Sequence, residues 1–268
     1  MQPSLLALDF DGVLCNGLKE YFQTAKQAYQ QIWPSDHDLA QYAESFYRLR
    51  PIVEHGWEMP LIIRAMLLEH TQEQILTNWP NLVQSLLKQE NIQPSTIIQQ
   101  IDRARDLQIA EDFPKWLSLQ EFYPGVIEKL RQIQDKKELF IYIITTKEGR
   151  FARKLLERAD IFLPAGHIIG KEVKQPKAQT LLDLSKSTGI TCEKIWFVED
   201  RLETLQLVQK QGQLKGIGLF LADWGYNLAK SRQEAQNDQQ INLLSLEQFQ
   251  ASFGEWPNKD VRFSQTSS

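Results

Sequence analysis

The chain has 268 residues and a mass of 31.2 kDa, enough for roughly two domains or for one domain with a large insertion. Hydrophobic residues make up 42% of the sequence and the mean hydropathy is −0.39, as in ordinary globular proteins. The 30 basic and 34 acidic residues give a formal net charge of −4. This balance argues against the basic surface with which proteins bind nucleic acids or anionic membranes.

The N-terminal segment and the cysteines indicate the compartment in which we expect the protein to act. The segment MQPSLLALDFDGVL lacks a basic stretch and reaches two aspartates after four apolar residues, unlike a secretory signal. The longest apolar run, 139–144, is far shorter than the ~20 residues that span a bilayer. Cys15 and Cys192 cannot form a disulfide framework. We therefore expect a cytoplasmic protein.

The first third of the chain combines one short strand with a long helical block. Residues 5–8 form an apolar run that ends at Asp9, which is typical of a buried strand that meets a loop. Over 17–118, apolar residues recur at helical spacing, and prolines lie between the successive runs, at positions 34, 51, 60, 80, 94 and 114. This pattern predicts an all-helical domain over 17–118.

From Tyr123 onward the pattern alternates between helices and strands. We expect helices near 126–133, 151–158, 178–185 and 205–208, strands at 139–144, 168–169, 195–198 and 216–221, a loop over 233–240 and one more element at 241–246. Such alternation indicates βαβ units and a parallel sheet covered on both faces. The prediction is a Rossmann-like, doubly wound α/β core, formed by 1–16 and 119–268, with the helical domain inserted after the first strand.

Polar side chains follow several of the predicted strands. The carboxyl ends of parallel strands meet at one edge of a sheet, where ligands bind. We therefore expect that edge to carry two acids after the first strand, two threonines, two acids after the strand 195–198 and one of three lysines: Asp9, Asp11, Thr145, Thr146, Glu199, Asp200, and Lys171, Lys174 or Lys177. Crowded carboxylates favour a hard cation such as Mg²⁺, and a lysine beside a hydroxyl suits a phosphoryl group.

These segments resemble the four motifs of the haloacid dehalogenase (HAD) superfamily, in the same order. LALDFDGVL resembles motif one, IYIITTKEG motif two, a lysine motif three, and WFVEDRLETL motif four. The turn 123–126, YPGV, resembles the segment that re-enters the core after the family's cap domain. The resemblance covers nearly the whole chain and implies a phosphatase of the C1-capped type, with the helical block as the cap.

The resemblance also implies a role for individual residues. Asp9 would be the nucleophile and Asp11 the general acid and base, while Thr145, with Thr146 as the alternative, would hold phosphoryl oxygens. Lys177, which opens a helix after a proline, fits motif three better than Lys171 or Lys174. The expected Mg²⁺ ligands are the side chains of Asp9 and Asp200 and the backbone carbonyl of Asp11, with Glu199 in or just behind the shell.

The acid at position 11 decides between reaction classes. Cleavage of a phosphate ester benefits from an acid that protonates the leaving oxygen, whereas cleavage of a carbon–halogen bond does not, so Asp11 favours a phosphatase over a dehalogenase. The expected function is a phosphatase acting on a small phosphorylated metabolite. Two alternatives stay open: a phosphomutase similar to beta-phosphoglucomutase, and a non-catalytic module that binds a phosphorylated ligand. The sequence indicates neither the substrate nor the oligomeric state.

Three features of the sequence have competing interpretations. Glu199 and Asp200 could cap the helix that follows them. The acid that commonly follows the motif-four aspartate by four positions is replaced by Thr204, with Glu203 one position earlier, so the role of Glu203 is open. The helix-breaking segment 50–58 is either a substrate-selecting loop or a packed interhelical loop; its candidate substrate contacts are Arg50, His55 and Trp57.

Overall fold

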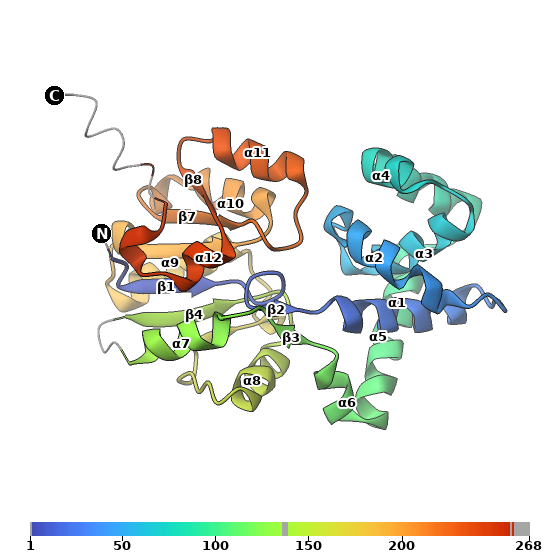
Figure 1. Ribbon diagram of the computed structural model, residues 1–268, viewed down its shortest axis with the longest axis horizontal. Helices are drawn as coiled ribbons and strands as arrows, with labels where there is room; N and C mark the ends of the chain where they lie inside the picture. The colour runs from blue at the N-terminus through green and yellow to red at the C-terminus, as the bar shows by residue number, and fades with distance from the viewer. Residues whose placement is uncertain (1, 136–138, 258, 260–268) are drawn as a thin grey trace. The chain divides into compact units, whose positions relative to one another are not determined.

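The computed structural model describes residues 2–135, 139–257 and 259, and the chain divides into two compact units. One unit is formed by Met1–Asn16 and Phe122–Ser268, the other by Gly17–Glu121. Figure 1 shows that the first unit contains a sheet and helices, whereas the second is helical.

The described part of the first unit forms a six-stranded parallel sheet with the order β5-β4-β1-β6-β7-β8. Its central strand, β1, pairs with β4 through Leu5 and Phe140 and with β6 through Leu5 and Ile195. The strands are β1 (Leu5–Leu8), β4 (Phe140–Ile144), β5 (Ile168–Ile169), β6 (Ile195–Glu199), β7 (Gly218–Ala222) and β8 (Ile241–Leu244). The predicted doubly wound parallel sheet is therefore confirmed.

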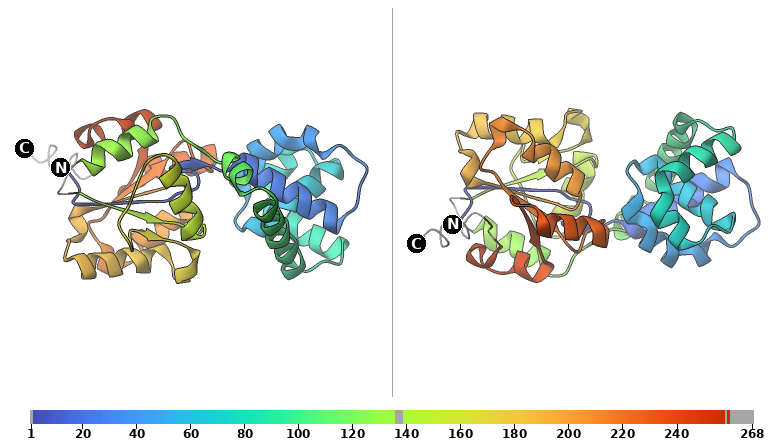
Figure 2. Two further views of the ribbon diagram at one scale, coloured as in Figure 1. Left: turned by 90° about the horizontal axis from the view of Figure 1, so that it is seen from below. Right: turned by 90° about the horizontal axis from the view of Figure 1, so that it is seen from above.

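Helices cover both faces of this sheet, as Figure 2 shows. One face, which includes Leu5, Phe197 and Leu219, packs against α9 (Lys177–Thr188), α10 (Leu202–Gln209) and α11 (Ala229–Asn237). On the other face, Trp196 contacts the ring of Trp256, in a cluster that follows α12 (Leu246–Gln250); α12 in turn contacts α7 (Val126–Gln134). Because both faces are buried, the inner strands are continuous apolar runs.

The second unit is built around α1 (Leu18–Ile32), which packs against α3 (Met59–Leu67) and α5 (Pro94–Glu111). Its other elements are η1 (Leu39–Tyr42), α2 (Ala43–Leu49), η2 (Arg50–Ile52), η3 (Gly56–Glu58), α4 (Gln72–Gln89) and α6 (Phe113–Ser118). Two short strands, β2 (Cys15–Asn16) and β3 (Glu121–Phe122), form a separate two-stranded sheet.

No helix in the described ranges is both long enough and apolar enough to cross a membrane.

One local prediction needs correction. The segment 233–240, expected to be a loop, lies largely in α11, whose single buried residue is Ala235; alanine, glutamine, glutamate and arginine form helices well even where no apolar stripe marks them. Pro80, by contrast, lies between two helical segments as expected, because the range of α4 joins two helices across a kink just before this proline. The backbone leaves helical values at Asn78, so the missing N–H of Pro80 falls in the turn after a kink, where its cost is small.

Candidate active site

Three buried carboxylates meet at the carboxyl edge of the sheet. Asp9 follows β1, Glu199 ends the neighbouring strand β6, and Asp200 follows it. Each acid offers a ligand oxygen, and these oxygens lie within 4.8 Å of one another. The residues are 7%, 1% and 1% exposed. The parallel pairing of β1 with β6 therefore brings together acids that are about 190 positions apart in sequence.

Lys177 is the cation that contacts this cluster. It is the first residue of α9, and its Nζ lies 2.8 Å from Oδ1 of Asp9 and 2.7 Å from Oε2 of Glu199. Lys171 instead pairs with Glu148 at 3.1 Å, and Lys174 is exposed at the end of a 3₁₀ turn (η4, Lys171–Val173). Of the three candidate lysines, Lys177 is thus the one placed beside Asp9.

The positive charge of Lys177 does not balance three buried acids. Burial, and then the charge of Glu199, raise the pKa of Asp9 to about 7, although Lys177 opposes the shift. Burial and the charge of Asp9 raise the pKa of Asp200 to about 6. Burial would lower the pKa of Lys177, but Asp9 and Glu199 outweigh it and raise that pKa. A bound divalent cation would relieve this repulsion, and carboxylate oxygens suit a hard cation.

The two neighbouring acids of β6 have different partners. Oε1 of Glu199 accepts the backbone N–H groups of Asp200 (3.2 Å) and Arg201 (3.0 Å), while Oε2 contacts Lys177. Both oxygens of Glu199 are therefore engaged, one of them at the N-terminus of α10. Asp200 instead accepts the N–H of Tyr226 at Oδ2, at 2.7 Å. Glu199 supports the start of the helix, and Asp200 faces the cluster.

Asp11 and Thr145 lie on the loops that follow β1 and β4. The side chain of Asp11 is 15% exposed, and its Oδ1 lies 3.3 Å from Nζ of Lys147. Thr145 is buried and its Oγ1 accepts the N–H of Lys147 at 3.0 Å, whereas Thr146 is exposed. Lys147, which the sequence places at the same strand end two positions after Thr145, had no predicted role.

The loop after β7 also contacts the acid cluster, which the sequence did not predict. Tyr226 donates its N–H to Asp200, and the Asn227 side chain donates to the backbone carbonyl of Asp200 at 3.0 Å. No local motif marks these residues. The available signal was topological: the end of β7 lies beside the end of β6, so its loop reaches the same edge of the sheet.

The other candidate residues lie apart from the acid cluster or in the helical unit. Glu203 is exposed and its carboxylate lies 3.6 Å from Arg201. Arg50 lies over the ring of Tyr21, 5.0 Å from its centroid. His55 and Trp57 have stacked rings, 6.4 Å apart. His55 is exposed and Trp57 half-buried, so both the recognition and the packing interpretations of the segment 50–58 have a physical basis.

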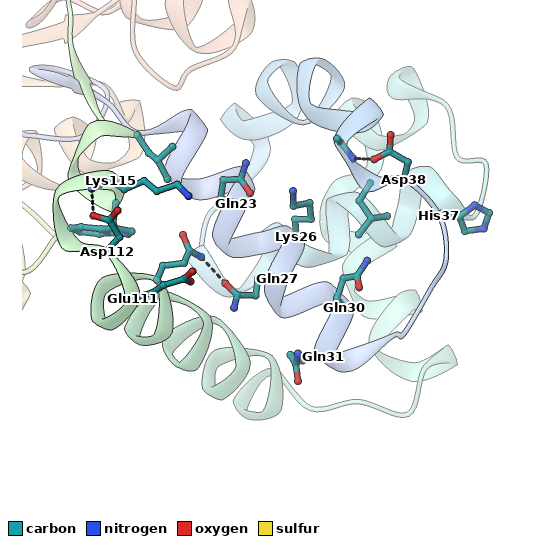
Figure 3. Close-up of a pocket in the computed structure, with 15 residues that line it drawn as sticks. Gln23, Lys26, Gln27, Gln30, Gln31, His37, Asp38, Glu111, Asp112 and Lys115 are labelled. Atoms are coloured by element: carbon teal, nitrogen blue, oxygen red, sulfur yellow. Dashed lines mark hydrogen bonds between the residues drawn. The ribbon is translucent and has the colours of Figure 1, made fainter.

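The helical unit contains a cavity of its own, of about 630 Å³, between α1 and the corner of α5 and α6 (Figure 3). Glutamines line much of it, and Gln108 donates to Gln27 at 3.0 Å. Two of its acids are helix caps: Asp38 accepts the N–H of Ala40, and Asp112 accepts that of Lys115. Within the described residues, the cluster of carboxylates suited to a metal lies at Asp9 and not in this cavity.

Comparisons with known proteins agree with this geometry. A family model described as haloacid dehalogenase-like hydrolase matches residues 3–208. A comparison with curated proteins found no match.

Similar solved structures include three bacterial proteins. The first, described as a predicted phosphatase from Clostridium acetobutylicum, has 15% identity and a TM-score of 0.58, covering 93% of this chain and 97% of the other. A haloacid dehalogenase-like hydrolase from Streptococcus pneumoniae has 14% identity and a TM-score of 0.57, with 90% and 93% covered. A predicted phosphoglycolate phosphatase from Haemophilus somnus has 16% identity and a TM-score of 0.55, with 86% and 92% covered. At such identities the likeness shows the fold alone.

Proposed function

Because the chain belongs to the haloacid dehalogenase-like hydrolases, we propose that it is a Mg²⁺-dependent phosphatase that hydrolyses a small phosphorylated metabolite. The observation that carries the proposal is the contact of Lys177 with both Asp9 and Glu199, beside the buried carboxylate of Asp200. This arrangement supplies a nucleophilic oxygen, a fixed cation and a metal site within one edge of the sheet. The phosphatase descriptions of similar folds support the same reaction class.

The metal would be held by the side chains of Asp9 and Asp200 and by the backbone carbonyl of Asp11, with Glu199 behind them. Bound there, Mg²⁺ supplies positive charge that screens the phosphoryl oxygens and the acids from one another. The raised pKa values of Asp9 and Asp200 support this assignment, because a cation would stabilise both in the ionised form that the reaction needs.

In the first half of the reaction, Asp9 attacks phosphorus. Phe10 N–H (2.7 Å) and Lys177 both hold Oδ1 of Asp9, which orients the carboxylate and leaves Oδ2 as the attacking atom. The new bond joins Oδ2 to phosphorus while the bond from phosphorus to the ester oxygen breaks. Asp11 gives its proton to that leaving oxygen, so the products are an alcohol and an aspartyl-phosphate.

In the second half, water releases the phosphate. The Asp11 carboxylate, now deprotonated, takes a proton from water as the water oxygen bonds to phosphorus. The bond between phosphorus and Oδ2 of Asp9 then breaks, which restores Asp9 and leaves inorganic phosphate. Thr145 and Lys177 hold phosphoryl oxygens in both steps, and Lys147, 3.3 Å from Asp11, keeps that side chain beside them.

In this proposal the helical unit is a C1-type cap that closes over the substrate. A site built only on strand ends is open to water, whereas a cap excludes water and contacts the leaving group. Its candidate contacts are Arg50, His55 and Trp57, in the segment between α2 and α3.

The decisive experiment is a panel of phosphorylated metabolites assayed for released phosphate with Mg²⁺, with EDTA, and with Zn²⁺ at the same concentration. We expect release with Mg²⁺ only. A parallel chromatographic search for isomerised sugar phosphates distinguishes hydrolysis from phosphoryl transfer within the substrate. Full release after dialysis against EDTA would contradict the metal site, and isomer formation without phosphate release would identify a phosphomutase.

The role of Asp11 has a separate test. Asp11→Asn is expected to slow the hydrolysis of an alkyl phosphate by about 10²- to 10⁴-fold, the usual contribution of a general acid. The loss should be smaller with p-nitrophenyl phosphate, whose leaving oxygen needs no proton. Equal losses on both substrates would remove Asp11 from the protonation step.

A further inference from the structure

The loop Asp223–Leu228, which follows β7, is bonded to both segments that carry the acids. Trp224 donates its Nε1–H to the carbonyl of Val13 at 3.0 Å, next to the loop of Asp9 and Asp11. Tyr226 donates its N–H to Oδ2 of Asp200 at 2.7 Å. We call Asp223–Leu228 the clamp loop.

Within the clamp loop, Asn227 fixes the backbone of Asp200. Asn227 is 7% exposed, and its Nδ2 donates to the carbonyls of Asp200 (3.0 Å) and Ala222 (2.8 Å). Its Oδ1 accepts from Nη1 of Arg232 at 3.1 Å, and the same nitrogen donates to the carbonyl of Asn227 at 3.0 Å. One buried amide thus joins the ends of β6 and β7, and an arginine of α11 orients that amide.

Two glycines leave the Asp200 side chain little room to rotate. A Cβ atom at Gly12 would lie 2.0 Å from Oδ2 of Asp200, and one at Gly225 would lie 2.3 Å from Cβ of Asp200 and 2.5 Å from the carbonyl oxygen of Gly12. Gly12 also has a φ of +86°, a conformation that favours glycine. Oδ2 of Asp200 is therefore enclosed between the first loop and the clamp loop.

We propose that Asn227 is a positioning residue for Asp200. With Oδ2 held by the N–H of Tyr226 and the backbone held by Asn227, Oδ1 is the oxygen presented to the cation. Groups that orient a metal ligand raise affinity because the ligand need not be ordered when the metal binds. This proposal rests on the metal site of the proposed function and adds the element that orients one of its ligands.

The test measures metal binding without substrate, with Mn²⁺ as the probe because it shares the oxygen ligands of Mg²⁺ and is detected by electron paramagnetic resonance. Asn227→Ala is compared with Asn242→Ala. Asn242 is an equally buried amide, 5% exposed, and its Nδ2 donates to the carbonyl of Leu219 at 3.2 Å. It lies on β8 and, among the residues that the structure describes, makes no hydrogen bond to the acid cluster. The two variants therefore distinguish the loss of a positioning contact from the loss of a buried amide.

Asn227→Ala is expected to raise the Mn²⁺ dissociation constant about 10- to 100-fold, while Asn242→Ala stays within about twofold of wild type at a similar melting temperature. If Asn227→Ala does not fold, Arg232→Ala decides, with an expected rise of about threefold or more in the same constant. An unchanged constant in the folded variant, or equal changes in the two asparagine variants, overturns the proposal.

Mn²⁺ binding by the wild type and by Asp200→Asn distinguishes a failure of the Asn227 proposal from a failure of the proposed function. Tight Mn²⁺ binding by the wild type that Asp200→Asn removes and Asn227→Ala does not would overturn the clamp alone. No Mn²⁺ binding by the wild type would overturn the metal site and the clamp with it.

Discussion

Buried carboxylates occur in both units, but their surroundings differ. In the helical unit, Oε1 of Glu20 accepts from Arg105 (2.9 Å), Thr24 (2.9 Å) and the indole of Trp116 (3.3 Å), so one acid has one cation and two further donors. At the sheet edge, three carboxylates lie together, and the ammonium of Lys177 contacts two of them, Asp9 and Glu199. An acid whose charge is neutralised by a cation within the protein stabilises the fold. Where buried acids outnumber the cations that contact them, the excess negative charge favours the binding of a cationic ligand.

The largest expected effect comes from removing one negative charge from the three carboxylates at the sheet edge. Asp9→Asn should reduce phosphate release to background, a loss of more than about 10⁴-fold, because an amide cannot form the aspartyl-phosphate. The variant should fold, and its melting temperature without metal should rise, since the repulsion between position 9 and Glu199 is gone. Activity near that of wild type would remove Asp9 from the mechanism.

Some features of the fold and of the site could be predicted from the sequence, and others could not. An unbroken apolar run such as 5–8 is read directly as a strand buried on both faces, and the order of the motifs indicates which strand ends meet. The fold and the family were predictable for this reason. The contact of Lys177 with Asp9 was predictable only as one of three choices, because Lys171 and Lys174 lie on the same segment and the distance depends on where α9 begins.

The parts that escaped prediction have no local signature. Asn227 donates to the backbone carbonyls of Asp200 and Ala222, at the ends of β6 and β7, and its neighbours in the sequence do not indicate these hydrogen bonds. The helix α11 is polar, with one buried alanine, so its periodicity is hidden. The contacts of Asn227 follow from the order of strands in the sheet and not from any pattern along the chain.

Removal of the buried acid of the helical unit, Glu20, should lower the free energy of unfolding. Glu20→Ala leaves Arg105 without its buried partner and should lower the free energy of unfolding by about 3–5 kcal/mol, measured by urea denaturation. Its control is Lys19→Ala, which removes a pair with Glu121 that is exposed at both ends and should leave stability within error of wild type. Equal effects of the two substitutions would contradict the account of the helical unit.

A smaller effect is expected in the segment between α2 and α3. Trp57→Ala should raise KM for the true substrate about 10-fold, equivalent to about 1.4 kcal/mol, and leave KM for p-nitrophenyl phosphate unchanged. The reason is that a half-buried indole stacked on an exposed His55 is available to a leaving group that the small substrate lacks. A lowered melting temperature with equal losses on both substrates would favour the packing interpretation.

The pH dependence of stability follows from the raised pKa values. Burial in the folded protein raises the pKa of Asp9 from 3.8 to about 7 and the pKa of Asp200 from 3.8 to about 6. The folded state therefore binds more protons than the unfolded state between about pH 4 and 7, so without metal these two groups make stability fall as pH rises through that window. Mg²⁺ should counter this fall, since it binds the ionised form.

The most direct measurement of this imbalance is the melting temperature of the wild type and of Asp9→Asn, at pH 5 and pH 8, with and without Mg²⁺. We expect Mg²⁺ to raise the wild-type value at pH 8 by about 3 °C or more, to change it little at pH 5, and to have a much weaker effect on Asp9→Asn. Without metal, wild type should lose stability relative to Asp9→Asn between pH 5 and pH 8. Parallel pH profiles for the two proteins, together with no response of the wild type to Mg²⁺ at pH 8, would contradict the claim that the acid cluster is an unbalanced metal site.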